Sequence, residues 1–363
     1  MAILQSLITI VVFFAILGGL VLVHELGHFV TARLAGVRVL EFGIGFPPRA
    51  RVIARGGETL YTLNWLPIGG FVKLEGEDGG DSGDPRSFAR ARLPVKLIIL
   101  VSGVAMNLVV AFLIFFLVAW VATPTMGVEV GQVEAGSPAE HAGIQPGDQI
   151  LSINGGQFEL FGPAILEGLR RHMGEQVTLD IRHADATTET VTTTLRPPSQ
   201  VDAQHGALGI RASQQIPTGS YVGRPFGDAL KLGADQTTRA LGLIVDGLGS
   251  LGASIVTNPT APPPAAGPIG IGLQLGNIMW GLGPVFTLMF AAILSANLAL
   301  VNILPFPPLD GGRMFVVSLK ALVGNAISVR AERMTYFVGF ALLFAFLIWI
   351  SVFDIARQGG AIQ

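Results

Sequence analysis

The chain has 363 residues, of which 50% are hydrophobic and 13% are charged; its formal net charge is -2 and it has no cysteine. A soluble domain carries about 25% charged residues, so this composition indicates an integral membrane protein with a modest soluble part. The small net charge and the lack of a basic patch predict no nucleic-acid partner. Without cysteine, disulfides and thiolate metal sites are excluded, and any metal must be held by His, Asp or Glu.

The first element is an apolar run, from Ile3 to Val23, that contains no charged residue. A membrane-spanning helix needs about 20 such residues. No basic residue precedes the run, and a group of ionisable residues stands where a signal peptidase would cut. We therefore interpret residues 1–32 as an uncleaved transmembrane helix in the lipid bilayer.

The motif His24-Glu25-Leu26-Gly27-His28 follows this run directly. Ionisable side chains at the end of a membrane segment are costly unless they have a function. Because residues i and i+4 share one face of a helix, the two imidazoles can hold one metal ion with Glu25 beside it. The motif predicts zinc ligands at His24 and His28 and a catalytic general base at Glu25, as in a zinc protease whose site lies inside the membrane.

Three further apolar stretches predict transmembrane helices, at residues 95–122, 282–304 and 334–354. A weaker stretch, Ala240–Val256, contains Asp246. We interpret it as an amphipathic or interfacial helix, within a segment 222–279 that also holds a proline-rich linker. The expected fold class is a polytopic α-helical membrane protein with four transmembrane helices.

Lys and Arg are concentrated in two of the connecting loops, 33–94 and 305–332. Loops rich in these residues stay on the cytoplasmic side of a membrane. Both termini and the segment 123–279 are therefore expected outside the cytoplasm.

The outer segment contains a stretch, Gly136 to Gly155, in which turn glycines separate short apolar strands. It closely resembles a PDZ domain of the circularly permuted bacterial type, which we assign to residues 127–211. Alternating residues at 177–181 and 191–195 predict further strands, and residues 207–210 are expected to close the small barrel. Whether the domain binds a peptide end, or is a β domain without a ligand, stays open.

Two histidines leave a catalytic zinc short of one protein ligand. The other four histidines all fall in the outer segment, on the wrong side of the membrane for this site. Asp310 is the only acidic residue between Asp246 and Glu332, and it ends the motif Asn302-Ile-Leu-Pro305-Phe-Pro307-Pro-Leu-Asp310-Gly. The prolines prevent a regular helix, and irregular backbone at membrane depth is tolerated where it lines a cavity. We predict Asp310 as the third zinc ligand.

Together the two motifs resemble the site-2 protease family of intramembrane zinc metalloproteases. The single PDZ-like domain is similar to the bacterial branch that cleaves anti-sigma factors. The resemblance implies cleavage of transmembrane segments of single-span membrane proteins (anti-sigma-factor-type substrates or signal-peptide remnants) in regulated intramembrane proteolysis and stress signalling. It also implies a multi-pass protein of the bacterial inner membrane with its active site near the cytoplasmic face. The family often has Gly-Pro-x-x-Asn in its second helix, whereas this chain reads Gly103-Val-Ala-Met-Asn107.

The resemblance also assigns substrate contacts. It implies that Asn302 binds substrate backbone, with Pro305 and Pro307 beside it. Glycine-punctuated strands at 42–46, 61–63 and 69–73 are implied to form a membrane-reentrant sheet that pairs with an extended substrate, through Gly43, Gly45, Gly69, Gly70 and Phe71. An ordinary cytoplasmic hairpin is the alternative. The acidic residues that follow are expected to form a solvated face: Glu75, Glu77, Asp78, Asp81 and Asp84.

Two other functions remain open on the sequence alone. Polar residues in membrane helices can mark an ion path, so the chain could be a zinc transporter. It could also be a non-catalytic membrane adaptor that works through its PDZ-like domain. Neither alternative explains Glu25 inside the histidine pair, which is why we favour hydrolysis.

Overall fold

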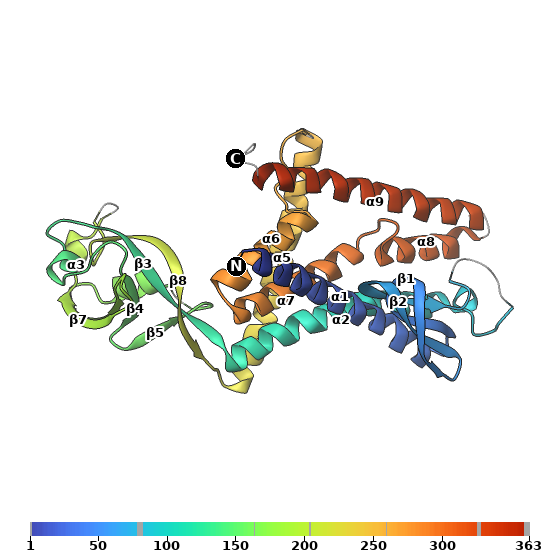
Figure 1. Ribbon diagram of the computed structural model, residues 1–363, viewed down its shortest axis with the longest axis horizontal. Coiled ribbons are helices and arrows are strands. Elements are labelled where there is room, and N and C mark those ends of the chain that lie inside the picture. Colours follow the sequence, from blue (N-terminus) through green and yellow to red (C-terminus); the bar gives the residue numbers. More distant parts are fainter. Residues whose placement is uncertain are drawn as a thin grey trace. The chain divides into compact units, whose positions relative to one another are not determined.

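The computed structural model describes residues 2–77, 83–162, 164–202, 205–258, 260–324 and 328–358. The chain divides into two compact units. The first consists of Leu117–Lys231, and the second consists of Met1–Phe116 together with Leu232–Gln363. The first unit is built mainly of strands and the second mainly of helices (Figure 1).

Within the described residues, five helices are long and apolar enough to cross a membrane. Four of them overlap the predicted transmembrane segments, although α7 is shorter than the predicted segment 282–304. The fifth contains the stretch that we expected at the membrane interface. By length and composition they fit a multi-pass membrane protein. These helices are α1 (Ala2–Leu34), α2 (Leu93–Val121), α5 (Phe226–Thr257), α7 (Pro284–Asn302) and α9 (Val329–Gln358).

The long helices differ in how far other parts of the protein cover them. Only 6% of the most apolar window of α1 is buried, against 33% for both α2 and α7. A helix that is apolar all round but little covered by protein is suited to lipid. We infer that α2 and α7 form the centre of the helical unit, with most of α1 on its lipid side.

Two shorter helices complete this unit, α6 (Pro268–Gly281) and α8 (Asp310–Val323). The prolines after α7 stop it at Asn302, as expected, because proline lacks the backbone donor that a helix needs. The chain then turns and restarts as a helix at Asp310. That position suits a carboxylate, because the first turn of a helix carries partial positive charge.

A hairpin of two long strands, β1 (Val39–Gly56) and β2 (Thr59–Leu74), contains the three predicted strands. The hairpin folds over itself: residues 41–44 of β1 pair both with residues 60–63 and with residues 70–73 of β2. Gly45 and Gly69 adopt positive φ angles of 81° and 71°, which other residues rarely tolerate. Buried side chains tie the hairpin to α1, to the short helix η1 (Phe88–Arg90) and to α2, among them Ala32, Val39, Leu74, Phe88 and Ile99.

The other unit is a six-stranded sheet in the order β7-β6-β4-β5-β3-β8. Its core is formed by alternating apolar residues of these strands, such as Val128, Ile150 and Leu179. The elements are β3 (Thr123–Val133), α3 (Pro138–His141), β4 (Gln149–Ile153), β5 (Gly156–Glu159), α4 (Ile165–Arg171), β6 (Gln176–Arg182), β7 (Thr188–Thr194), η2 (Pro198–Gln200) and β8 (Ile210–Val222).

The limits of this domain differ from those expected from the sequence. The strands predicted at 177–181 and 191–195 lie in β6 and β7, apart from the last residue of the second. Residues 207–210, which we expected to close the barrel, reach only the start of β8. The closing strand runs on to Val222 because β8 pairs with the whole of β3, from Val133 opposite Ile210 to Thr123 opposite Val222. The folded domain therefore covers 123–222 rather than 127–211.

Candidate active site

Three potential metal ligands meet in the helical unit. His24 and His28 lie one turn apart on α1 and are buried, with exposed fractions of 5% and 7%. Asp310 approaches them from the first turn of α8: its Oδ2 lies 2.8 Å from His24 Nε2 and 3.3 Å from His28 Nε2. The two Nε2 atoms are 3.1 Å apart. The sequence analysis predicted that these three residues bind one metal ion. The structure places their donor atoms within 4.8 Å of one another.

The arrangement of the donor atoms fits zinc. Ligand atoms about 2.0–2.1 Å from a tetrahedral zinc ion lie about 3.3 Å from one another, close to the three spacings found here. Two imidazoles and one carboxylate are also a donor set that zinc accepts in catalytic sites, where a fourth position stays open for water. The residues present therefore fit a catalytic zinc.

Two glycines allow the helices to come close enough for this site. A Cβ atom at Gly27 of α1 would lie 2.5 Å from the backbone oxygen of Ser102 on α2. A Cβ at Gly103 of α2 would lie 2.5 Å from His28 Nε2 and 2.7 Å from His24 Nε2. Any larger residue at position 103 would therefore occupy the space that the donor atoms face.

A backbone group of α2 orients one of the imidazoles. His28 Nδ1 lies 2.7 Å from the carbonyl oxygen of Ile99. A carbonyl can only accept, so Nδ1 carries the proton and donates it. The lone pair of Nε2 is then free to bind a metal, which is the usual arrangement for a metal-binding histidine.

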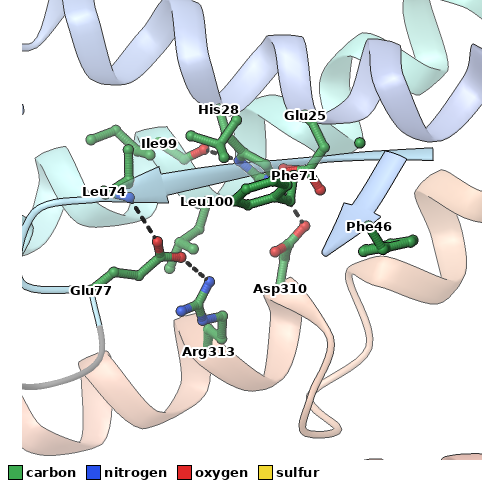
Figure 2. Close-up of a pocket in the computed structure, with 12 residues that line it drawn as sticks. Glu25, His28, Phe46, Phe71, Leu74, Glu77, Ile99, Leu100, Asp310 and Arg313 are labelled. Atoms are coloured by element: carbon green, nitrogen blue, oxygen red, sulfur yellow. Dashed lines mark hydrogen bonds and ion pairs between the residues drawn. The ribbon is translucent and has the colours of Figure 1, made fainter. Parts of the chain in front are cut away.

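Glu25 lines two cavities beside the donor cluster. The first has a volume of about 140 Å³ and is also lined by His28, Gly70, Phe71 and Asp310. Figure 2 shows Glu25 and His28 reaching from α1 towards Asp310 on α8. The second cavity, of about 280 Å³, is also lined by His24, Asp310 and Asn302. Glu25 is therefore placed next to the cluster, where a substrate or water could reach both.

The predicted substrate-contact residues divide into two groups. Gly70 and Phe71 line the first cavity and Asn302 lines the second. Four of the others lie in tightly packed positions: Gly43 lies against the ring of Phe71, Gly45 against the backbone of Leu66, Gly69 against the side chain of Val21 on α1, and Pro307 against Gly312 and Gly339. For Pro305 the structure gives an exposed position.

Two charged residues of the site were missed by the sequence analysis. Glu77, expected on a solvated face, lines the first cavity with Arg313. It forms an ion pair with Arg313, and it accepts a hydrogen bond of 2.9 Å from the backbone N–H of Leu74 (Figure 2). The spacing of Arg313, one helical turn after Asp310, was the available signal, because such residues share a helix face.

The solvated-face interpretation fails at a second position as well. Asp84 has a side chain that is only 17% exposed and pairs with Arg38 at 3.0 Å. Burial of a carboxylate is tolerated here because an opposite charge compensates it. Glu75 is half-buried, and Asp78 and Asp81 lie outside the described residues.

Comparison with known proteins identifies the class. The model of peptidase family M50 matches residues 12–346, nearly the whole chain. The chain belongs to this family, the site-2 proteases, and is a zinc metalloendopeptidase with several membrane helices.

Similar proteins agree with this assignment over nearly their full length. One, from Clostridium acetobutylicum and named among the zinc metalloproteases, is 31% identical over 355 residues, which are 97% of this chain and 98% of the relative. The zinc metalloprotease RasP of Geobacillus kaustophilus is 26% identical over 433 residues, covering 97% of this chain and 99% of the relative. The prediction of a hydrolase is thus confirmed over those of a transporter or an adaptor.

Proposed function

We propose that this protein is an intramembrane endopeptidase in which His24, His28 and Asp310 hold the catalytic zinc and Glu25 is the general base. Its substrates would be the transmembrane segments of single-span membrane proteins, including those of the anti-sigma-factor type, in regulated intramembrane proteolysis. The observation that carries this proposal is the His24–His28–Asp310 cluster beside Glu25. Both histidines and Glu25 lie on α1, a helix long and apolar enough to cross a bilayer.

The roles of the protein's own groups follow from their chemistry. Zinc in this site supplies a Lewis acid, which makes water nucleophilic near neutral pH and polarises a peptide carbonyl. Glu25 would accept the proton of the attacking water and deliver it to the leaving amine. Asn302, which lines the second cavity together with Glu25, can donate its amide N–H to a substrate carbonyl and hold the backbone in place.

Substrate would bind in an extended form along β2. A transmembrane helix protects its peptide bonds inside its own hydrogen bonds, so it must unwind before hydrolysis. Residues 70–73 of β2 pair with β1 on one side, and Gly70 and Phe71 of the same segment line the cavity beside Glu25. A substrate strand that paired with this segment would bring its backbone to the site, which is β-augmentation.

Water needs a polar route to a site inside a membrane. A third cavity, of about 510 Å³, shares Phe71, Val72, Glu77 and Arg313 with the first. Apart from Pro47, its other lining residues are polar, for example Glu41 and Arg49. In our proposal this charged cavity connects the site with the cytoplasmic side, where the Lys- and Arg-rich loops lie.

Contacts of α6 support the four-span topology over five spans. The N-terminal end of α6 is held by Asp354, near the end of α9, which accepts N–H groups of Gly267 and Gly270 at 3.1 and 2.8 Å. Its other end is held by Trp280, which donates to Thr9, near the start of α1, at 2.9 Å. In the proposed orientation both contacts lie towards the outer face.

The connection between α5 and α6 then limits what α5 can do. If α5 crossed the membrane, the segment 258–267 that follows would have to cross back. This segment is short and contains three consecutive prolines, and a non-helical lipid-exposed segment does not cross hydrocarbon. We therefore keep α5 at the interface, as the sequence analysis predicted.

In its described residues, the β domain of residues 123–222 has six strands and two short α-helices, which supports its assignment as a PDZ-like domain. In the proposed orientation it lies outside the cytoplasm of a bacterium, at the inner membrane, while the zinc site lies near the cytoplasmic face. A bilayer core of about 30 Å then separates the two. The domain would select substrates, either by excluding large ectodomains or by binding a newly made peptide end.

A pair of substitutions tests the assignment of the site. Glu25→Gln should abolish cleavage of a single-span substrate and keep the zinc, because the amide cannot accept a proton. Asp310→Ala should lose zinc as well, because two imidazoles alone bind it weakly. Zinc content and cleavage are measured on both purified proteins. Substantial cleavage by Glu25→Gln, or full zinc occupancy in Asp310→Ala, would contradict the proposal.

A further inference from the structure

Asn107 on α2 is a buried polar residue that neither the ligand set nor the general base accounts for. Its side chain has no solvent exposure. As placed, Nδ2 lies 3.4 Å from His24 Nδ1, and Oδ1 is buried without a hydrogen-bond partner among the described residues. A buried amide oxygen that lacks a donor is costly, by about 1–3 kcal/mol.

The protonation of His24 decides which amide atom should face it. A neutral histidine that offers its Nε2 lone pair to a metal carries its proton on Nδ1. That Nδ1 is then a donor and needs an acceptor, which Nδ2 is not. The oxygen and nitrogen of an amide have nearly the same shape, so their assignment follows from the hydrogen bonds. Turning the amide over places Oδ1 beside Nδ1 of His24, where it accepts that proton, and moves Nδ2 to the buried position that Oδ1 held.

One face of α2 lies beside the Nδ1 atoms of both histidines. Ile99, Gly103 and Asn107 follow one another at intervals of four residues, so they share one face of the helix. Ile99 offers its carbonyl to Nδ1 of His28 at 2.7 Å, and Gly103 leaves the space that the two Nε2 atoms face. Asn107 completes this row next to Nδ1 of His24.

We propose that Asn107 is a positioning residue whose Oδ1 accepts the Nδ1–H of His24 and so fixes the ring orientation and tautomer that bind zinc. This inference rests on the proposed role of His24 as a ligand. It gives a purpose to the Gly103…Asn107 motif and explains why the proline after Gly103 can be absent: the motif acts through the glycine space and the asparagine acceptor. Partners of this kind typically contribute a factor of about 10–100 to metal affinity.

Three variants separate positioning from a structural role, with zinc affinity of the metal-free protein measured by competition with a chelator. Asn107→Leu removes the acceptor and should weaken zinc binding about 10–100-fold. Asn107→Asp keeps an oxygen that can only accept and should bind within threefold of wild type. Ser295→Ala is the matched control, because buried Ser295 Oγ donates to the backbone oxygen of Asn107 at 2.8 Å and, among the described residues, makes no hydrogen bond to His24.

A second readout reports the geometry of the site directly. The absorption bands of Co²⁺ bound in place of zinc depend on ligand orientation, so they should shift in Asn107→Leu and stay unchanged in Asn107→Asp and Ser295→Ala.

The result that overturns the inference is a less than tenfold loss of zinc affinity in Asn107→Leu, or an equal loss in Ser295→Ala. If Asn107→Leu does not fold, Asn107→Asp decides alone: a loss of tenfold or more shows that the amide does not act as an acceptor. A further variant, His24→Ala, tests separately the assumption that His24 is a zinc ligand. If that variant keeps its zinc, the proposed ligand set fails; if it loses zinc while Asn107→Leu does not, only the role of Asn107 fails.

Discussion

Individual residues set both the metal site and the charge balance of the β domain. In that domain His183 Nδ1 lies 3.0 Å from Asp148 Oδ1, and its Nε2 lies 3.3 Å from Glu189 Oε2. The hydrogen bond to Asp148, aided by the one to Glu189, raises the pKa of His183 above its ordinary value. Asp148 is almost fully buried, so the protonated histidine compensates a carboxylate that water does not reach.

This pair predicts a pH dependence. Because the pKa of His183 is higher in the folded protein than in the unfolded chain, where it is about 6.5, its contribution to stability is complete below pH 6.5. It is lost as the pH rises through the folded pKa. Hydrogen exchange of β4 and β6 in the full-length protein should therefore speed up as the pH rises above about 6.5, after correction for intrinsic rates. His183→Gln should lack this change; identical profiles for the two proteins would contradict the assignment.

The sequence was enough to predict that His24, Glu25, His28 and Asp310 form one site, because few other residues near these apolar stretches could bind a metal ion. A helix brings i and i+4 together whatever surrounds it, and one acidic residue was available near the end of a neighbouring apolar stretch. Their roles in catalysis stay predictions. Glu77 could not be placed in the same way, because an acidic residue in a loop is usually solvated and its partner, Arg313, is remote in sequence.

At the scale of elements, the attachment of β2 to α8 is the contact that should govern substrate pairing. Glu77 accepts the N–H of Leu74, the last residue of β2, and pairs with Arg313 on α8. It thereby holds the strand segment 70–74 beside the cavity. The side chains of Glu77 and Arg313 are only 16% and 29% exposed, so solvent weakens this pair less than an exposed one.

Glu77→Gln should loosen this strand without touching the metal. Hydrogen bonds to charged groups contribute about 1.5–3 kcal/mol, so amide exchange at 70–74 should become at least about tenfold faster. KM for a single-span substrate should rise severalfold, with zinc content unchanged. Glu58→Gln is the matched control, because its ion pair with Arg86, 2.8 Å long, is half exposed. Equal effects of both substitutions would show that the Glu77 contact has no special role.

The folded-over pairing of β1 and β2 is a feature that the sequence analysis did not predict. Short strands were predictable from glycines and alternating apolar residues, and the helices from long apolar runs. The double pairing of residues 41–44 depends on partners up to about thirty positions away, which local pattern does not specify. The same holds for β8, whose polar residues become a strand because the full length of β3 lies beside it.

At the scale of the whole molecule, the β domain can be removed cleanly. Its first and last strands pair at their ends, Thr123 opposite Val222, so a short Gly-Ser turn could replace residues 124–221. We expect the shortened protein to cleave a substrate with a large ectodomain at least about tenfold faster than the intact protein does. Both should cleave an already trimmed substrate alike, because in the proposed orientation the domain and the zinc site belong to opposite faces of the bilayer. If the shortened protein folds and keeps its zinc but cleaves neither substrate, the selection role fails and the domain must support the active structure.

The central claim is that hydrolysis takes place inside the membrane and depends on zinc. The most direct test places the purified protein in lipid vesicles with a single-span substrate and maps the cut bond by mass spectrometry, with a zinc chelator and with zinc restored. The account predicts one or a few cuts within the apolar segment, near its cytoplasmic end, that stop with the chelator and return with zinc. Cuts confined to the soluble flanks of the substrate, or cuts that the chelator does not affect, would contradict it.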